Sequence, residues 1–222
     1  MSIAQEIIKI NNELPSSARL VAGSKFHPAE AIEEAYAAGQ RIFGESRPQE
    51  LAAKAPVLPN DIEWHFIGHL QTNKLKMVIP YVSLIHSVDS KRLLMEINKF
   101  ASARNMKVNC LLELFVATEE SKQGFSEEEL LELVEALAEN PLQGVELCGI
   151  MGMASFTEDE QLIRSEFKKL SGTFELIKNK YPDSFPNFKH LSMGMSNDYH
   201  IALEYGSTLV RIGTRIFGER VY

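Results

Sequence analysis

The chain has 222 residues, of which 45% are hydrophobic and 24% are charged, an ordinary globular composition. Its net charge of -7 argues against nucleic acid or an anionic membrane surface as the main partner. Both cysteines, Cys110 and Cys148, lie in apolar runs, which predicts buried, reduced thiols and no disulfide framework. The first residues lack signal-peptide features, and no apolar run reaches transmembrane length. We therefore expect a cytoplasmic protein.

The chain opens with a helix signal. Ser2 and Gln5 have the spacing of a capping box, and Ile7 and Ile10 fall on one helical face. This pattern predicts an amphipathic helix that ends before Pro15 and precedes the first strand.

Strand and helix signals then alternate to the end of the chain. Short apolar runs predict strands at residues 20–24, 41–45, 64–68, 84–88, 108–115, 145–151, 190–193 and 208–212. Every run except the last is followed by a helical or turn segment. Thr157 and Glu160 are predicted to cap the longest helix. The residues between the second and third runs, with Pro56 and Pro59, are interpreted as a proline-punctuated connection.

This alternation predicts an α/β protein, a single (β/α)8 TIM barrel with one extra helix at its amino terminus. A doubly wound open sheet is the competing architecture, but no glycine-rich dinucleotide fingerprint follows the first strand. No linker, composition shift or short repeat divides the chain. Residues 1–222 are therefore predicted to form one domain.

The first predicted strand ends in Gly23-Ser24-Lys25, directly before a helix. In a barrel, side chains from the carboxyl ends of the strands converge on the active face. A desolvated lysine amine at that face can attack a carbonyl and form a Schiff base. The alternative is that Lys25 extends from the strand end into water.

Two loops have the features of a phosphate site. Ser196 follows Gly194 after the seventh predicted strand, and Gly213 and Thr214 follow the eighth. These are the loops that often hold phosphate in barrels, where backbone N–H groups and hydroxyls can donate to it. Alternatively, Gly213 only turns the chain and Ser196 only caps a helix.

A phosphate site and an amine at one barrel mouth fit a ligand that carries both a phosphate and an aldehyde. Pyridoxal 5'-phosphate (PLP) has this layout, and a phosphosugar bound by Lys25 is the rival. Arg211 would face inward if side-chain alternation holds, and an arginine beside the pyridine nitrogen of PLP opposes protonation there. The alternative is that Arg211 pairs with Glu45 or another carboxylate.

Several stretches, in order over nearly the whole chain, match one known family. They are Val21-Ala22-Gly23-Ser24-Lys25, Phe43-Gly44-Glu45, Trp64-His65-Phe66-Ile67-Gly68-His69-Leu70-Gln71 with Asn73-Lys74, His86-Ser87-Val88-Asp89, Glu120-Ser121-Lys122 with Gly124-Phe125, Leu191-Ser192-Met193-Gly194-Met195-Ser196, and Val210-Arg211-Ile212-Gly213-Thr214 with Ile216-Phe217-Gly218. The chain closely resembles the YggS/PROSC family of pyridoxal phosphate homeostasis proteins. The resemblance implies a barrel similar to the amino-terminal barrel of bacterial alanine racemase.

The resemblance also implies roles for individual residues. Lys25 aligns with the lysine that forms the aldimine with PLP, and Arg211 with the arginine that faces the pyridine nitrogen. The other implied cofactor-binding residues are Ser192 and Met193 beside the ring, and Ser196, Gly213 and Thr214 in the phosphate cradle. The family usually has asparagine where this chain has Ser46, so a cofactor contact from that position is left open.

We expect binding rather than catalysis. A racemase needs a second base opposite the lysine, and two-domain relatives supply it from a carboxyl-terminal domain of a partner subunit. No such domain is expected here, since Tyr222 ends the sequence, and nothing favours Tyr222 or Tyr199 as a substitute. The predicted function is a monomeric PLP-binding protein that buffers vitamin B6 or delivers PLP to apoenzymes. A small PLP-dependent racemase is the alternative.

The histidines give no metal-ligand spacing, so no metal is predicted. His65 lies in an apolar strand and is interpreted as a structural core residue.

Overall fold

The computed structural model describes residues 2–117 and 123–218. The matching stretch Glu120-Ser121-Lys122 and the alternative base Tyr222 lie outside the described residues.

The predicted barrel is confirmed. All strand pairs are parallel, neighbours in sequence are neighbours in space, and β8 pairs with β1 to close the sheet. The strands are β1 (Arg19–Gly23), β2 (Ile42–Glu45), β3 (Glu63–Phe66), β4 (Val82–Val88), β5 (Val108–Glu113), β6 (Val145–Met151), β7 (His190–Ser192) and β8 (Leu209–Ile212). Each predicted strand is present, and none of its ends differs from the prediction by more than two residues.

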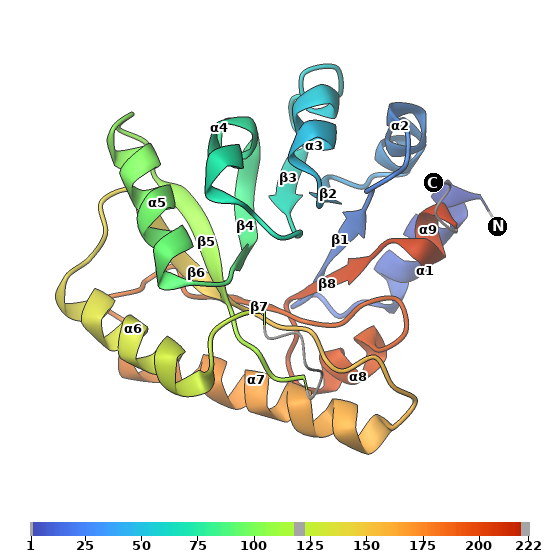
Figure 1. Cartoon of the computed structure of the whole chain (residues 1–222). Helices are drawn as coiled ribbons and strands as arrows, with labels where there is room; N and C mark the ends of the chain where they lie inside the picture. The colour runs from blue at the N-terminus through green and yellow to red at the C-terminus, as the bar shows by residue number, and fades with distance from the viewer. Residues whose placement is uncertain (1, 118–122, 219–222) are drawn as a thin grey trace.

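Helices surround the barrel (Figure 1). They are α1 (Ile3–Glu13), α2 (Ala29–Ala37), α3 (Pro48–Lys54), the 3-10 turn η1 (Thr72–Lys74), α4 (Leu75–Val78), α5 (Lys91–Ser102), α6 (Glu127–Glu139), α7 (Glu160–Lys180), α8 (Tyr199–Glu204) and α9 (Thr214–Phe217). No helix among the described residues is long and apolar enough to cross a membrane.

Two local predictions about helices are wrong. Part of the predicted connection between the second and third strands is the helix α3, with Pro48 at its first position, where proline is tolerated. Asp159, rather than Thr157, caps α7, because the Asp159 carboxylate accepts from the N–H groups of Gln161 and Leu162.

Side-chain alternation divides the apolar residues into two cores. A large core lies between the strands and the helices, and a smaller cluster fills the barrel. The inner cluster comprises Val21, Ile42, Leu84, Leu111, Cys148, Met151 and Leu209. Inward-facing residues nearer the carboxyl ends of the strands continue the same alternation, so Arg211, two residues after Leu209, points into the barrel.

The extra helix α1 is fixed against the helices that follow β7 and β8. Arg215 of α9 pairs with Glu6 (Nε–Oε2 3.1 Å) and donates to the hydroxyl of Tyr199 on α8. That hydroxyl donates in turn to Glu13. In Figure 1, α1 lies beside α9. Helix α1 therefore supports the side of the barrel that carries the two predicted phosphate loops.

Among the described glycines, Gly149 of β6 leaves the least room for a side chain, and the register between β5 and β6 shifts near it. Gly149 has φ +149°, and a Cβ there would lie 1.8 Å from the carbonyl oxygen of His190 on β7. Gly149→Ala should therefore lower the free energy of unfolding by about 2–3 kcal/mol. Urea unfolding followed by circular dichroism measures this change.

Gly172 provides a matched control. It lies on the exposed face of α7, and a Cβ there meets nothing within 4 Å. Gly172→Ala should raise the free energy of unfolding by about 0.5–1 kcal/mol, since alanine favours helix. Equal effects of the two substitutions would contradict the close approach at Gly149.

Candidate cofactor-binding site

The predicted site residues lie near or just after the carboxyl ends of strands, at one mouth of the barrel. Lys25 comes two residues after β1 and Ser196 four residues after β7, while Gly213 and Thr214 come directly after β8. The loops after β1 and β8 touch, because a Cβ on Gly213 would lie 2.8 Å from the carbonyl oxygen of Gly23. The fold thus places the lysine loop directly beside one of the phosphate loops.

The lysine loop has an unusual backbone. Phe26, directly after the half-buried Lys25, has φ 67°, which is rare for an aromatic residue. The next ring, His27, stacks on Phe217 of α9 with 5.1 Å between ring centroids. The loop that carries Lys25 is therefore in contact with the helix that follows β8.

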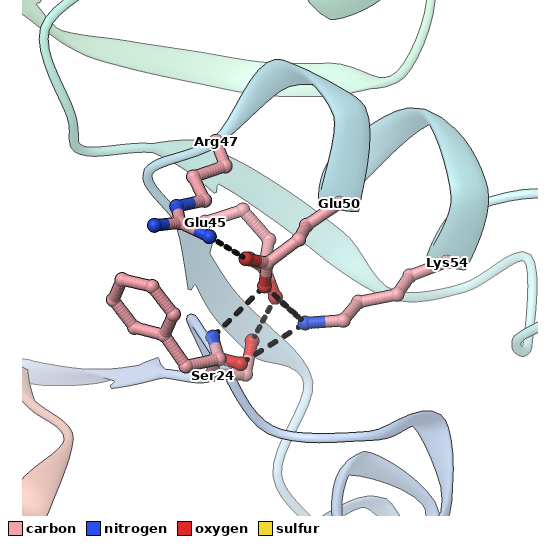
Figure 2. Close-up of polar contacts among 6 residues, drawn as sticks. Ser24, Glu45, Arg47, Glu50 and Lys54 are labelled. Atoms are coloured by element: carbon pink, nitrogen blue, oxygen red, sulfur yellow. Dashed lines mark hydrogen bonds and ion pairs between the residues drawn. The ribbon is translucent and has the colours of Figure 1, made fainter. Parts of the chain in front are cut away.

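Behind this loop lies a buried charge cluster (Figure 2). The Lys54 Nζ donates to Glu45 Oε1 (2.8 Å), Glu50 Oε2 (3.0 Å) and the carbonyl of Ser24 (3.1 Å). Glu45 also accepts from the Ser24 hydroxyl, but its second oxygen has no partner among the described residues. Burial raises the pKa of Glu45 even though Lys54 lies beside it. The cluster belongs to the layer between β1, β2 and α3, outside the barrel lumen.

Arg211 lies inside the barrel. Its Nη1 donates to the Ser192 hydroxyl (2.6 Å) and its Nη2 to the carbonyl of Gly152 (3.0 Å). Glu45 pairs with Lys54 instead, so the alternative pairing of Arg211 with Glu45 is wrong. Burial lowers the pKa of Arg211 to about 10, so the guanidinium still carries its charge at neutral pH.

A hydrogen-bonded chain continues from Arg211 across the barrel. Ser192 contacts His86 Nδ1 (2.9 Å), and His86 Nε2 contacts His65 Nδ1 (2.9 Å). The Ser192 hydroxyl accepts from Arg211, and His86 is the only other hydrogen-bond partner of its Oγ among the described residues. We therefore infer that Ser192 donates to His86 and that both imidazoles are neutral, with the proton on Nε2. His65 is the structural core histidine that its apolar strand predicts.

The two phosphate loops present unpaired backbone donors. Within residues 2–117 and 123–218, the N–H groups of Ser196, Gly213 and Thr214 find no protein acceptor. The loop after β7 is shaped by Asp198, whose carboxylate accepts from the N–H of Met195, and by Gly194 with φ 92°. These donors suit a bound anion such as a phosphate group.

Two other candidate residues, Met193 and Ser46, differ in which of their groups can face the mouth. The Met193 side chain is fully buried in the outer core, so only its main chain can face the mouth. Ser46 packs against the end of β3, because a Cβ on Gly68 would lie 2.6 Å from the Ser46 Cβ. Ser46 is therefore at the mouth, with a short side chain.

Sequence reasoning assigned no role to two polar residues of the interior, His86 and Glu113. Burial, with a smaller contribution from the nearby Asp89, raises the pKa of Glu113 to about 7. Both residues stand two positions after an apolar residue of the inner cluster, Leu84 or Leu111. The two-residue alternation of inward-facing positions along these strands could have identified both residues from the sequence.

The comparisons with known proteins agree with this geometry. The alanine racemase, N-terminal domain family matches residues 2–221. A pyridoxal phosphate homeostasis protein from Aquifex aeolicus is 43% identical over 206 residues, which cover 92% of this chain and 88% of the relative. The chain belongs to the pyridoxal phosphate homeostasis protein family.

Solved structures of one relative share the whole fold. PipY from Synechococcus elongatus without PLP is 34% identical, with a TM-score of 0.91 over 98% of this chain and 100% of PipY. The structure of PipY with PLP bound has a TM-score of 0.87, with the same identity and coverage. The family resemblance and the barrel expected from it are thus confirmed.

The histidine chain predicts how the rings respond to pH. Burial lowers the pKa of His65 to about 3 and that of His86 well below its ordinary value. NMR spectra of 15N-labelled protein should show both rings neutral, with the proton on Nε2, from pH 8 to pH 5.

The lowered pKa values of His65 and His86 also make the stability of the folded protein depend on pH. An unfolded chain takes up protons on these histidines below about pH 6.5, whereas the folded chain does not. Their contribution to stability should therefore fall as the pH is lowered from about 6.5 toward 3. A ring that becomes protonated near its ordinary pKa in the folded protein would contradict the proposed chain.

Proposed function

We propose that this protein binds PLP at the carboxyl-terminal mouth of a single barrel domain, with Lys25 as the covalent attachment point. The observation that carries the proposal is the charged guanidinium of Arg211, buried in the barrel on the strand that pairs with β1. A cation fixed there suits the unprotonated nitrogen of a pyridine ring and opposes its protonation. PLP bound to PipY, a relative with the same fold, supports this reading.

The residues of the chain fit the parts of PLP. Ser196, Gly213 and Thr214 offer N–H groups for the phosphate, since these donors have no protein acceptor among the described residues. Ser192 is held beside Arg211, and the main chain of Met193 completes that side of the mouth. When bound, PLP supplies an aldehyde that reacts with amines and a ring that withdraws electrons.

We further propose that the protein holds PLP, and passes it to apoenzymes, without turning over amino acids. A racemase needs two bases, and the alternative base Tyr199 is buried with its hydroxyl bonded to Glu13 and Arg215. Burial raises the pKa of Tyr199 to about 12. The names of the relatives, pyridoxal phosphate homeostasis proteins, favour the same role.

The attachment is tested by spectroscopy and peptide mapping. Protein incubated with PLP should become yellow, and borohydride should then fix a pyridoxyl group on the peptide that contains Lys25. Lys25→Ala should lose the adduct yet retain weaker, non-covalent PLP through the phosphate loops. Lys91→Ala, which removes an exposed lysine elsewhere, should behave as the parent. An unchanged adduct in Lys25→Ala, or a protein that takes up no PLP and instead traps a sugar phosphate, would refute the proposal.

The absence of turnover is tested separately. PLP-loaded protein mixed with amino acids in deuterated water should leave the α-hydrogen in place over hours, because the alternative base Tyr199 is bonded to Glu13 and Arg215. The measurement is the α-proton signal by NMR, with an authentic alanine racemase as positive control. Exchange at enzymatic rates would favour the racemase alternative.

A further inference from the structure

Both peptide groups that flank Lys25 are hydrogen-bonded to one ion pair of α3 (Figure 2). The carbonyl of Ser24, on the amino-terminal side, accepts from Lys54 Nζ (3.1 Å). The N–H of Phe26, on the carboxyl-terminal side, donates to Glu50 Oε2 (2.8 Å). Lys54 and Glu50 pair with each other at 3.0 Å, one helical turn apart. The backbone on either side of Lys25 is therefore bonded to two linked charges.

The ion pair is itself firmly held. Lys54 is 9% exposed, and its three donors are matched by three acceptors: Glu50, Ser24 and the fully buried Glu45. Burial opposes ionisation of Glu50, but the bonds from Phe26 and Lys54 outweigh it and lower its pKa. Charged hydrogen bonds in such a place are stronger than those between neutral groups.

The bond from Glu50 also acts on a strained residue. Phe26 has φ 67°, a conformation that costs an aromatic residue free energy and persists only where the surroundings impose it. Arg47 stacks over the Phe26 ring at 4.0 Å and lies 3.7 Å from Glu50 Oε1. Without Glu50, the backbone after Lys25 would lose the acceptor of its N–H and could relax.

We propose that Glu50 and Lys54 are positioning residues for Lys25: by fixing the backbone on both sides of it, they hold its amine where it can react with the PLP aldehyde. The inference rests on the proposed function. In the reaction, Lys25 Nζ bonds to the aldehyde carbon, and the aldehyde oxygen leaves as water with the two hydrogens of the neutral amine. Correct placement of two reacting groups supplies a large part of such a rate.

The test separates covalent attachment from binding. Glu50→Ala should slow the formation of the Lys25 adduct by roughly tenfold to a hundredfold, as expected for a misplaced reacting group. The rate is measured by stopped-flow absorbance and confirmed by borohydride trapping and peptide mapping. Glu50→Gln keeps an oxygen that can accept from Phe26, so it should restore most of the rate.

Combining Glu50→Ala with Lys25→Ala shows whether Glu50 acts through Lys25. In Lys25→Ala, which binds PLP only non-covalently, adding Glu50→Ala should change the dissociation constant of PLP by less than about twofold. Glu160→Ala is the matched control, since Glu160 also lies in the first turn of a helix and pairs with a residue four positions on, Arg164. The Glu160→Ala variant should form the Lys25 adduct at the wild-type rate. Thermal unfolding measurements check that each variant is folded.

Each result has a distinct meaning. Wild-type rates in both Glu50 variants would overturn the positioning role and leave the proposed function intact. An equal loss of PLP affinity in the Lys25→Ala background would also overturn it, because the effect would then be a general disturbance of the site. A parent protein that forms no adduct on Lys25 would overturn the proposed function, and this inference with it.

Discussion

The ammonium group of Lys54 joins β1, β2 and α3 at one point. Its three acceptors come from the ends of both strands and from its own helix, and one of them, Glu45, is completely buried. A buried carboxylate without its cation would be costly, and so would the cation without its acceptors. The position of α3 against the barrel, and with it the course of the chain through Lys25, therefore depends on this interaction.

Inside the barrel, Arg211 likewise connects several segments of the chain through its hydrogen bonds. Its guanidinium is held between the Ser192 hydroxyl and the Gly152 carbonyl, and the chain of donors and acceptors extends through His86 to His65. Because the histidines remain neutral, Arg211 keeps its charge without a second cation beside it. Within the described residues, the interior of the barrel thus holds the fixed positive charge of Arg211 near the mouth and the apolar inner cluster below it.

The sequence was sufficient to predict the fold and to assign each candidate site residue to a strand or a loop of it. Short apolar runs, separated by helical patterns, marked the strands, and Arg211 points inward, as expected if the side chains of its strand alternate. Helix α3 was not predicted because Pro56 and Pro59 indicated an irregular connection. Glu50 and Lys54 nevertheless have the four-residue spacing of a helical ion pair. The left-handed Phe26 could not be predicted, because its conformation is imposed by groups that are distant in sequence.

The two halves of the site depend on different parts of the chain. Helix α3 holds the lysine loop, whereas α1 holds the helices after β7 and β8 through Arg215 and Tyr199. The halves meet where Gly23 approaches Gly213 and where His27 stacks on Phe217. A ligand that joins the amine of one half to the donors of the other adds a further link between them, and it stabilises the folded barrel in proportion to its occupancy.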